Sequence, residues 1–487
     1  MTGRILVLCL ITAVSVGAGS ALIADETEDL FLSAVSAEKN GDLEKAVDRF
    51  NKLIEADPGN AAMYNNRGVV RTRMKDYAGA IDDFGKALTL DSDNAGIYYN
   101  RGMAHEDKGD VDEAFRDYDE ALKIDPDNVS VLFTRARLGQ KLGKTASAEQ
   151  DLETILRMDG RNCKALVMLG NLHLTDGHFS KALKEFSKAL RYEPRSIEAA
   201  RGSGDAYFLD GKFRKAVEAY GKALDSGGQD PHILINRCSA FIQIGEFHKA
   251  IDDCEAGLKL DPGKGHGHYN LANARAALGK NREALEAFNR AIESAPNQPG
   301  YRYNRGIVLK KLDRPEEALG DFNKVLELDP GNAQALNNKG LILWQMGKAG
   351  EAEDVFQRAL KADSKNIEVL KNLARAYLAE KRPDDAIRIL GEALRLDPRD
   401  PDVTAALGDA WLDKEDADKA LKYYRQSLKR EKDPQTKSRL LVRIGVAHER
   451  EGQESKAIKA YSSALSLAED DGLRQGLKKR IDRIKSR

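Results

Sequence analysis

The sequence has few aromatic residues, prolines and cysteines for its length. Among 487 residues there are 13 prolines and 4 cysteines, and Phe, Trp and Tyr together make up 6%. Runs of β-branched residues are also scarce, whereas Ala, Leu, Lys, Glu and Arg dominate. This composition favours helices over sheets. The chain is too long for one compact core, so it should be built from domains or repeats.

The chain also lacks an excess of either charge. It has 77 Lys and Arg against 78 Asp and Glu, a formal net charge of −1. A balanced charge gives no general reason to expect nucleic acid or another polyanion as the partner. We therefore expect no nucleic-acid partner.

Sequence motifs for catalysis, cofactors and metals are missing as well. There is no Gly-rich phosphate-binding loop, no His-Glu-x-x-His and no metal-spaced cysteine cluster. His232 and His266 occupy equivalent places one sequence period apart, too far from each other to share one ion, and no third ligand is evident. We predict that the protein is not an enzyme, needs no cofactor and has no metal site.

Beyond the N-terminal segment, no stretch is long and apolar enough to cross a membrane. The one long apolar run follows Arg4, and small residues follow the run before the first acidic residue, Asp25. This layout predicts a secretory signal within residues 1–24, a mature chain that begins near Leu22 or Asp25, and export to the periplasm or the extracellular space. The alternative is an uncleaved membrane anchor formed by residues 5–24.

The dominant feature of the sequence is a repeat of 34 residues. Counted in units from Thr27, the twentieth position is alanine in twelve successive units and in a thirteenth after a slip of three residues. These residues are Ala46, Ala80, Ala114, Ala148, Ala182, Ala216, Ala250, Ala284, Ala318, Ala352, Ala386, Ala420 and Ala457. The eighth position is always a small residue, and the twenty-fourth is usually aromatic. Two antiparallel helices in each unit account for these columns, because helices approach closely only where one of them presents a small side chain.

In spacing and residue type this pattern resembles the tetratricopeptide repeat (TPR) family. The resemblance implies an all-α, right-handed α-solenoid of about thirteen 34-residue helix-turn-helix repeats, with repeats 1–12 over residues 27–434 and repeat 13 over residues 438–471. Apolar residues at helical spacing over 472–487 predict a C-terminal capping helix, which a stack of repeats needs at its end.

The sixth position of the units is rich in asparagine. The residues there include Asn66, Asn100, Asn236, Asn270, Asn304, Asn338 and Asn372. The TPR resemblance implies that first helices line a concave groove, with this position facing inward. It looks like the asparagine ladder of the O-linked N-acetylglucosamine transferases, which implies that these amides bind an extended polypeptide backbone. An amide both donates and accepts hydrogen bonds, so it can pair with any peptide unit.

Polar and aromatic neighbours complete the predicted peptide-binding set. They are Tyr269, Asn273, Tyr303 and Trp344. The alternative is that the asparagines belong to the repeat consensus and hydrogen-bond neighbouring first helices. The carboxylate clamp of chaperone-binding TPR domains needs basic residues that no three successive units provide, so a chaperone C-terminal carboxylate is a disfavoured partner.

Two cysteines replace packing residues within one unit. Cys238 stands at the eighth position and Cys254 at the twenty-fourth. They are either two buried small side chains or a disulfide, and an oxidising compartment favours the disulfide.

Taken together, these features predict a non-catalytic scaffold that binds extended segments of other proteins in its groove, as an envelope assembly factor. Two other functions stay open. One is a structural or self-associating spacer. The other is the targeting subunit of an enzyme whose catalytic site lies on another chain.

Overall fold

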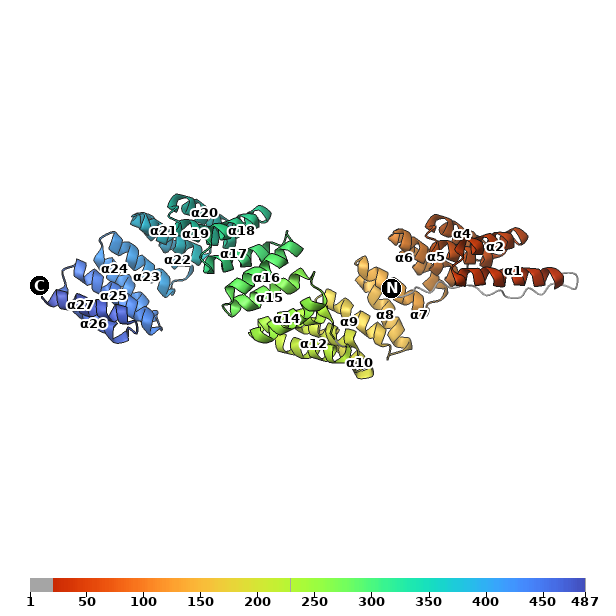
Figure 1. The fold of residues 1–487 in the computed structure, drawn as a ribbon, viewed down its shortest axis with the longest axis horizontal. Coiled ribbons are helices and arrows are strands. Elements are labelled where there is room, and N and C mark those ends of the chain that lie inside the picture. Colours follow the sequence, from red (N-terminus) through yellow and green to blue (C-terminus); the bar gives the residue numbers. More distant parts are fainter. Residues whose placement is uncertain (1–20, 228, 487) are drawn as a thin grey trace. The chain divides into compact units, whose positions relative to one another are not determined.

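A computed structural model describes residues 21–227 and 229–486, and this part of the chain consists of α-helices joined by short turns (Figure 1). This part of the chain divides into two compact units, the first ending at Ile244 and the second beginning at Gly245. The helices of the first unit are α1 (Ala21–Asn40), α2 (Leu43–Ala56), α3 (Ala61–Arg73), α4 (Tyr77–Leu90), α5 (Ala95–Lys108), α6 (Val111–Ile124), α7 (Val129–Lys141), α8 (Thr145–Met158), α9 (Cys163–Thr175), α10 (Phe179–Tyr192), α11 (Ile197–Leu209), α12 (Phe213–Gly227) and α13 (Pro231–Gln243).

The second unit continues the same alternation. Its helices are α14 (Phe247–Leu260), α15 (Gly265–Ala277), α16 (Asn281–Ser294), α17 (Pro299–Lys311), α18 (Pro315–Leu328), α19 (Ala333–Gln345), α20 (Ala349–Ala362), α21 (Ile367–Ala379), α22 (Pro383–Leu396), α23 (Pro401–Asp413), α24 (Ala417–Arg430), α25 (Pro434–Arg450), α26 (Glu454–Leu467) and α27 (Asp471–Lys485). The predicted all-α helical-repeat solenoid is confirmed.

From α3 to α24 the helices follow the 34-residue period residue by residue. The first helix of each repeat begins at position one of that repeat, as at Ala61 and Ala95, and the second helix begins at position seventeen. Asparagine often caps the first helix, and the side chain of Asn94 accepts a hydrogen bond from the backbone N–H of Gly96. The first helices of the first and last repeats begin earlier than predicted. Helix α1 begins before residue 27, and α25 begins at Pro434, before residue 438 and directly after its capping residue Asp433.

Within each unit, every helix packs against the next helix in the chain, and neighbouring first helices also touch. Such first-helix contacts join α9 to α11 and α11 to α13 in the first unit, and α15 to α17 and α19 to α21 in the second. At the C-terminus, α27 contacts α26 and buries Leu477, Ile481 and Ile484.

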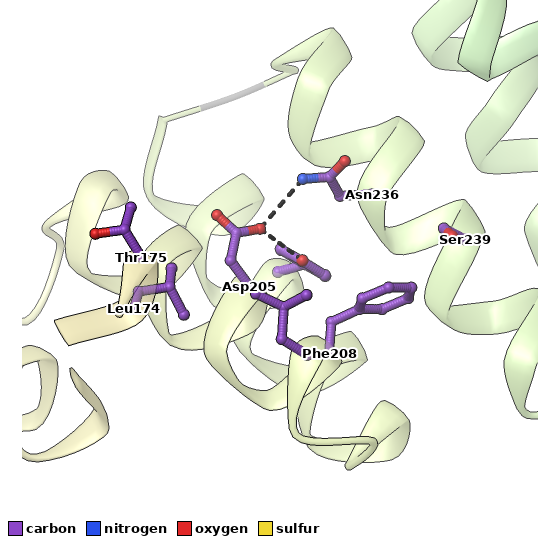
Figure 2. A pocket seen from close by; sticks show the side chains of 8 residues that line it. Leu174, Thr175, Asp205, Phe208, Asn236 and Ser239 are labelled. Carbon is purple, nitrogen blue, oxygen red and sulfur yellow. Dashed lines mark hydrogen bonds between the residues drawn. The ribbon is translucent and has the colours of Figure 1, made fainter. Parts of the chain in front are cut away.

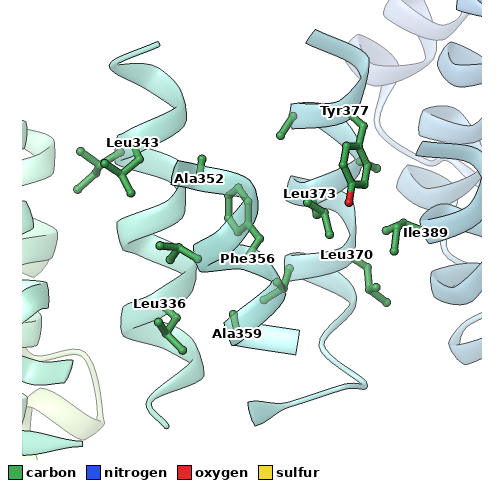
Figure 3. Close-up of a cluster of buried hydrophobic side chains, with 14 of the residues drawn as sticks. Leu336, Leu343, Ala352, Phe356, Ala359, Leu370, Leu373, Tyr377 and Ile389 are labelled. Carbon is green, nitrogen blue, oxygen red and sulfur yellow. The ribbon is translucent and has the colours of Figure 1, made fainter. Parts of the chain in front are cut away.

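The core is built from the small and aromatic columns. All thirteen alanines at position twenty are at most 1% exposed. A Cβ atom on Gly340, at position eight, would lie 2.6 Å from a ring carbon of Phe356, at position twenty-four. Figure 3 shows the Phe356 ring between the leucines of α19 and those of α21, next to Ala352 and Ala359. At Gly340 the Phe356 ring therefore leaves no room for a side chain on the first helix.

A recurring Arg–Asp pair, which was not predicted from the sequence, joins the two helices of several repeats. Arginine at position seven binds aspartate at position twenty-three through two parallel hydrogen bonds. In Arg305–Asp321 these measure 2.7 and 2.6 Å, and Asp321 is 2% exposed. The same pair joins Arg67 to Asp83, Arg101 to Asp117 and Arg135 to Asp151.

Candidate functional site

The first helices α9, α11 and α13 enclose a pocket of about 520 Å³ in the first unit (Figure 2). Most of its lining comes from positions six, nine, twelve and thirteen of successive first helices, the face that the family resemblance assigns to the groove. The lining residues are Leu174, Thr175, Asp205, Phe208, Leu209, Tyr220, Asn236 and Ser239.

Asp205 is the charged group of this pocket. Its Oδ1 atom accepts hydrogen bonds from the hydroxyl of Tyr220 at 2.7 Å and from the amide of Asn236 at 3.2 Å (Figure 2). Burial first, and then the Asp205 carboxylate, raise the pKa of Tyr220, so its hydroxyl stays a proton donor at neutral pH. The other carboxylate oxygen, Oδ2, has no hydrogen-bond partner among the described residues.

The walls of the pocket are apolar. Leu209 ends α11 and is 57% exposed, although it is a large hydrophobic side chain. Leu174 and Phe208 also line the pocket. The pocket can therefore hold an aliphatic group against its walls and a polar or charged group at Asp205.

Only Asn236 of this pocket belongs to the set predicted from sequence. The sequence does contain a signal for Leu209. It stands at position thirteen, where the other repeats carry a polar or small residue such as Thr175, Gln243 or Lys311. Asp205 carried no comparable signal, because aspartate is common throughout the chain.

In the second unit, the structure brings three predicted residues together at Asn304 of α17. The amide nitrogen of Asn304 donates to the hydroxyl of Tyr269 and to Oδ1 of Asn273, both at 2.9 Å. The ring of Tyr269 also stacks on Tyr301, with ring centres 4.7 Å apart. The amide nitrogen of Asn304 therefore donates its hydrogen bonds to the preceding first helix, α15.

Asn338 is satisfied more completely. Its amide nitrogen donates to the Tyr303 hydroxyl at 3.2 Å and to the backbone oxygen of Gln334 at 3.1 Å, and its Oδ1 accepts from the Lys310 ammonium at 2.8 Å. Asn372 likewise donates to Asn337 at 3.0 Å. Both side chains are buried. These asparagines hold neighbouring first helices together, as the alternative interpretation predicts.

Asn66 and Asn100 are fully buried, so they offer no surface to a ligand, and we leave them out of the proposed site. The amide of Asn100 donates to Asn65 at 2.9 Å. Asn270, by contrast, is half-buried and has no hydrogen-bond partner in the described part of the chain. Trp344 is half-buried and lines a smaller pocket, of about 450 Å³, where α19 ends and α20 begins.

The remaining predicted features lie partly beyond what the structure describes. Residues 1–20 of the predicted signal or anchor are outside the described residues. Among those that are described, no helix has the length and apolar character to span a membrane. Cys163 is a free, buried thiol, and burial raises its pKa to about 11. Cys238 and Cys254 are both buried, and the disulfide between them stays a prediction.

The helix order, the 34-residue register and the packing columns define an α-helical repeat protein that presents successive first helices as a surface. Sequence profiles described as tetratricopeptide repeat match residues 30–60, 95–128, 167–231, 235–302, 303–367, 343–410 and 438–471, and a profile described as TPR repeat matches residues 71–109. The chain belongs to the tetratricopeptide repeat family.

Several solved structures are similar to this chain. One is a tetratricopeptide repeat protein from Parabacteroides merdae, with 21% identity over 51% of this chain and 97% of that chain and a TM-score of 0.43. Yeast Tom70 has 19% identity over 88% and 96%, with a TM-score of 0.40. YrrB, a TPR protein with an unusual peptide-binding site, has 23% identity over 38% and 96%, with a TM-score of 0.35. No curated protein matches the sequence.

Proposed function

We propose that this protein is a non-catalytic scaffold that binds extended segments of other proteins along its first helices. The observation that carries the proposal is the pocket between α9, α11 and α13, which combines apolar walls with a carboxylate and an amide on the predicted groove face. Pockets that bind ligands specifically have this character of apolar walls and a few placed polar groups.

The hydrogen bonds change which asparagines we assign to the polypeptide. The amides of Asn236 and Asn270 keep donor or acceptor capacity, since Asn236 makes one hydrogen bond and Asn270 makes none within the described chain. Asn273 accepts one hydrogen bond and retains its own donors. Asn338 is committed to its neighbours. The binding surface thus consists of separated polar points, and aromatic residues such as Trp344 supply apolar contacts.

The N-terminal segment supports export, so we place the scaffold at the cell envelope, where it would assist the assembly of other proteins. A self-associating spacer and the targeting subunit of an enzyme on another chain are the competing functions. They differ from the proposal in what occupies the pocket: a second copy of this chain, or the folded surface of a catalytic subunit.

Site-specific photo-cross-linking tests the proposal. A benzophenone amino acid at Ser239, inside the pocket, should capture partner proteins from the native envelope fraction, and mass spectrometry should place the links within short linear segments of those partners. The matched control carries the same group at Glu218, an exposed position on the second helix α12. Equal capture from both positions, or none from Ser239, would exclude the groove as the binding surface. Links to another copy of the chain would support the spacer.

A further inference from the structure

The pocket of the first unit has a counterpart in the second unit, six repeats further along the chain. There, Asp409 occupies position nine of its repeat, as Asp205 does, and Tyr424 occupies position twenty-four, as Tyr220 does. The Tyr424 hydroxyl donates to Oδ1 of Asp409 at 2.8 Å, and the Tyr220 hydroxyl donates to Oδ1 of Asp205 at 2.7 Å. The chain therefore contains twice the same pair of a buried tyrosine and a partly exposed aspartate.

The two copies differ in what faces the second carboxylate oxygen. In the second unit, Nη1 of Arg443 lies 2.9 Å from Oδ2 of Asp409 and forms an ion pair with it. Arg443 stands at position six of the following repeat, and Asn236 stands at that position in the first unit. The amide of Asn236 shares Oδ1 with Tyr220 and leaves Oδ2 without a partner in the described chain. In the first unit, therefore, no guanidinium group of the described chain pairs with the Asp205 carboxylate as Arg443 pairs with Asp409.

From this internal comparison we infer that the pocket between α9, α11 and α13 binds the side chain of an arginine residue in the partner polypeptide. The guanidinium would donate to Oδ2 of Asp205, as Arg443 does to Asp409 in the chain itself. The methylene groups would lie along Leu174, Phe208 and Leu209, where an amphipathic side chain can bury its aliphatic part. This inference rests on the proposed function, because it assigns a side-chain preference to the same groove.

The charges around the pocket agree with this assignment. Asp205 is the one ionisable carboxylate among the lining residues, and no Lys or Arg belongs to the lining. Arg201 lies one turn earlier on α11 and forms no ion pair with Asp205 within the described residues. A neutral guest would leave the Oδ2 atom without a partner once water is displaced, which carries a penalty. A carboxylate guest would add repulsion between like charges.

Peptide binding to the full-length protein tests the inference. The probe is a fluorescein-labelled nonapeptide of alternating serine and leucine with one central arginine, measured by fluorescence anisotropy. A second peptide carries citrulline at the centre, which keeps the shape of arginine and removes its charge. The arginine peptide should bind about tenfold to a hundredfold more tightly, as expected for a hydrogen bond between charged groups. The variant Asp205→Asn should remove that advantage and leave the citrulline peptide unaffected.

Substitutions at Asn236 test whether a guanidinium group at Asp205 blocks the binding of the arginine peptide, independently of any effect on folding. Asn236→Arg supplies from the chain the guanidinium that Arg443 provides in the second unit, so it should abolish the preference for arginine. Asn236→Gln, which adds length without charge, should keep the preference. Asp409→Asn breaks the internal ion pair and should lower the melting temperature without changing peptide affinity. Circular dichroism checks that each variant folds.

The outcomes distinguish this inference from the proposed function. Equal binding of the two peptides, or an arginine preference that survives both Asp205→Asn and Asn236→Arg, would overturn the arginine site and leave the scaffold intact. Binding of neither peptide would overturn the arginine site as well. The scaffold itself is judged by the cross-links from Ser239, which need no arginine in the partner.

Discussion

Replacing Asn338 with alanine separates the structural asparagines from those available to a ligand. Asn338 makes two neutral hydrogen bonds and accepts a third from the Lys310 ammonium. Neutral bonds contribute about 1 kcal/mol each and a charged one about 2 kcal/mol, so about 4 kcal/mol is removed. Alanine regains about 0.6 kcal/mol as a better helix former, and the partly buried Lys310 can recover some hydration. We expect a net loss of about 2 kcal/mol.

Hydrogen exchange measured by mass spectrometry is the suitable assay, because repeat proteins open locally and a single unfolding free energy does not describe them. In the Asn338→Ala variant, the amides of α17 and α19 should exchange about thirtyfold faster, the factor that corresponds to 2 kcal/mol. Helices far along the chain, such as α5, should be unchanged.

The matched control is Asn270→Ala, at the same repeat position. Asn270 has no hydrogen-bond partner among the described residues and is half-buried, so exchange in α15 should be unchanged or slightly slower. We expect this variant, and not Asn338→Ala, to weaken polypeptide binding. The hydrogen bonds assign Asn338 a structural role and leave Asn270 available to a ligand. A comparable loss of protection in both variants, or full protection in Asn338→Ala, would refute this assignment.

Two further predictions concern packing and redox state. Gly340→Ala places a methyl group against the Phe356 ring and should destabilise its repeat by about 1–3 kcal/mol. Gly391→Ala has no atom within 4 Å of the new Cβ and should stabilise its own repeat by about 0.5–1 kcal/mol. Thermal melting of the two variants measures the difference, and equal effects would contradict the assignment of Gly340 to close packing. If Cys238 and Cys254 are bonded, denatured, unreduced mature protein should titrate one thiol, that of Cys163, and three thiols would exclude the bond.

The repeat register and its packing were predictable because their causes are local. The alanine, glycine and aromatic columns recur at fixed positions, and each reports a contact within one helix pair, as Gly340 and Phe356 do. A contact between residues sixteen apart in a rigid hairpin follows from the period alone. The Arg305–Asp321 pair has the same separation and could have been found from its columns in the same way.

The use of each polar side chain was decided by tertiary structure. Asn304 and Asn338 bond to residues 31 and 35 positions earlier, on the preceding first helix, and Asn270 in the same column bonds to none in the described chain. A hydrogen bond needs its two atoms within about 3 Å, so it depends on how one repeat is placed against the next. Sequence identified the column of asparagines, and the packing of neighbouring first helices decided which amides, and which oxygen of Asp205, remain open to a partner.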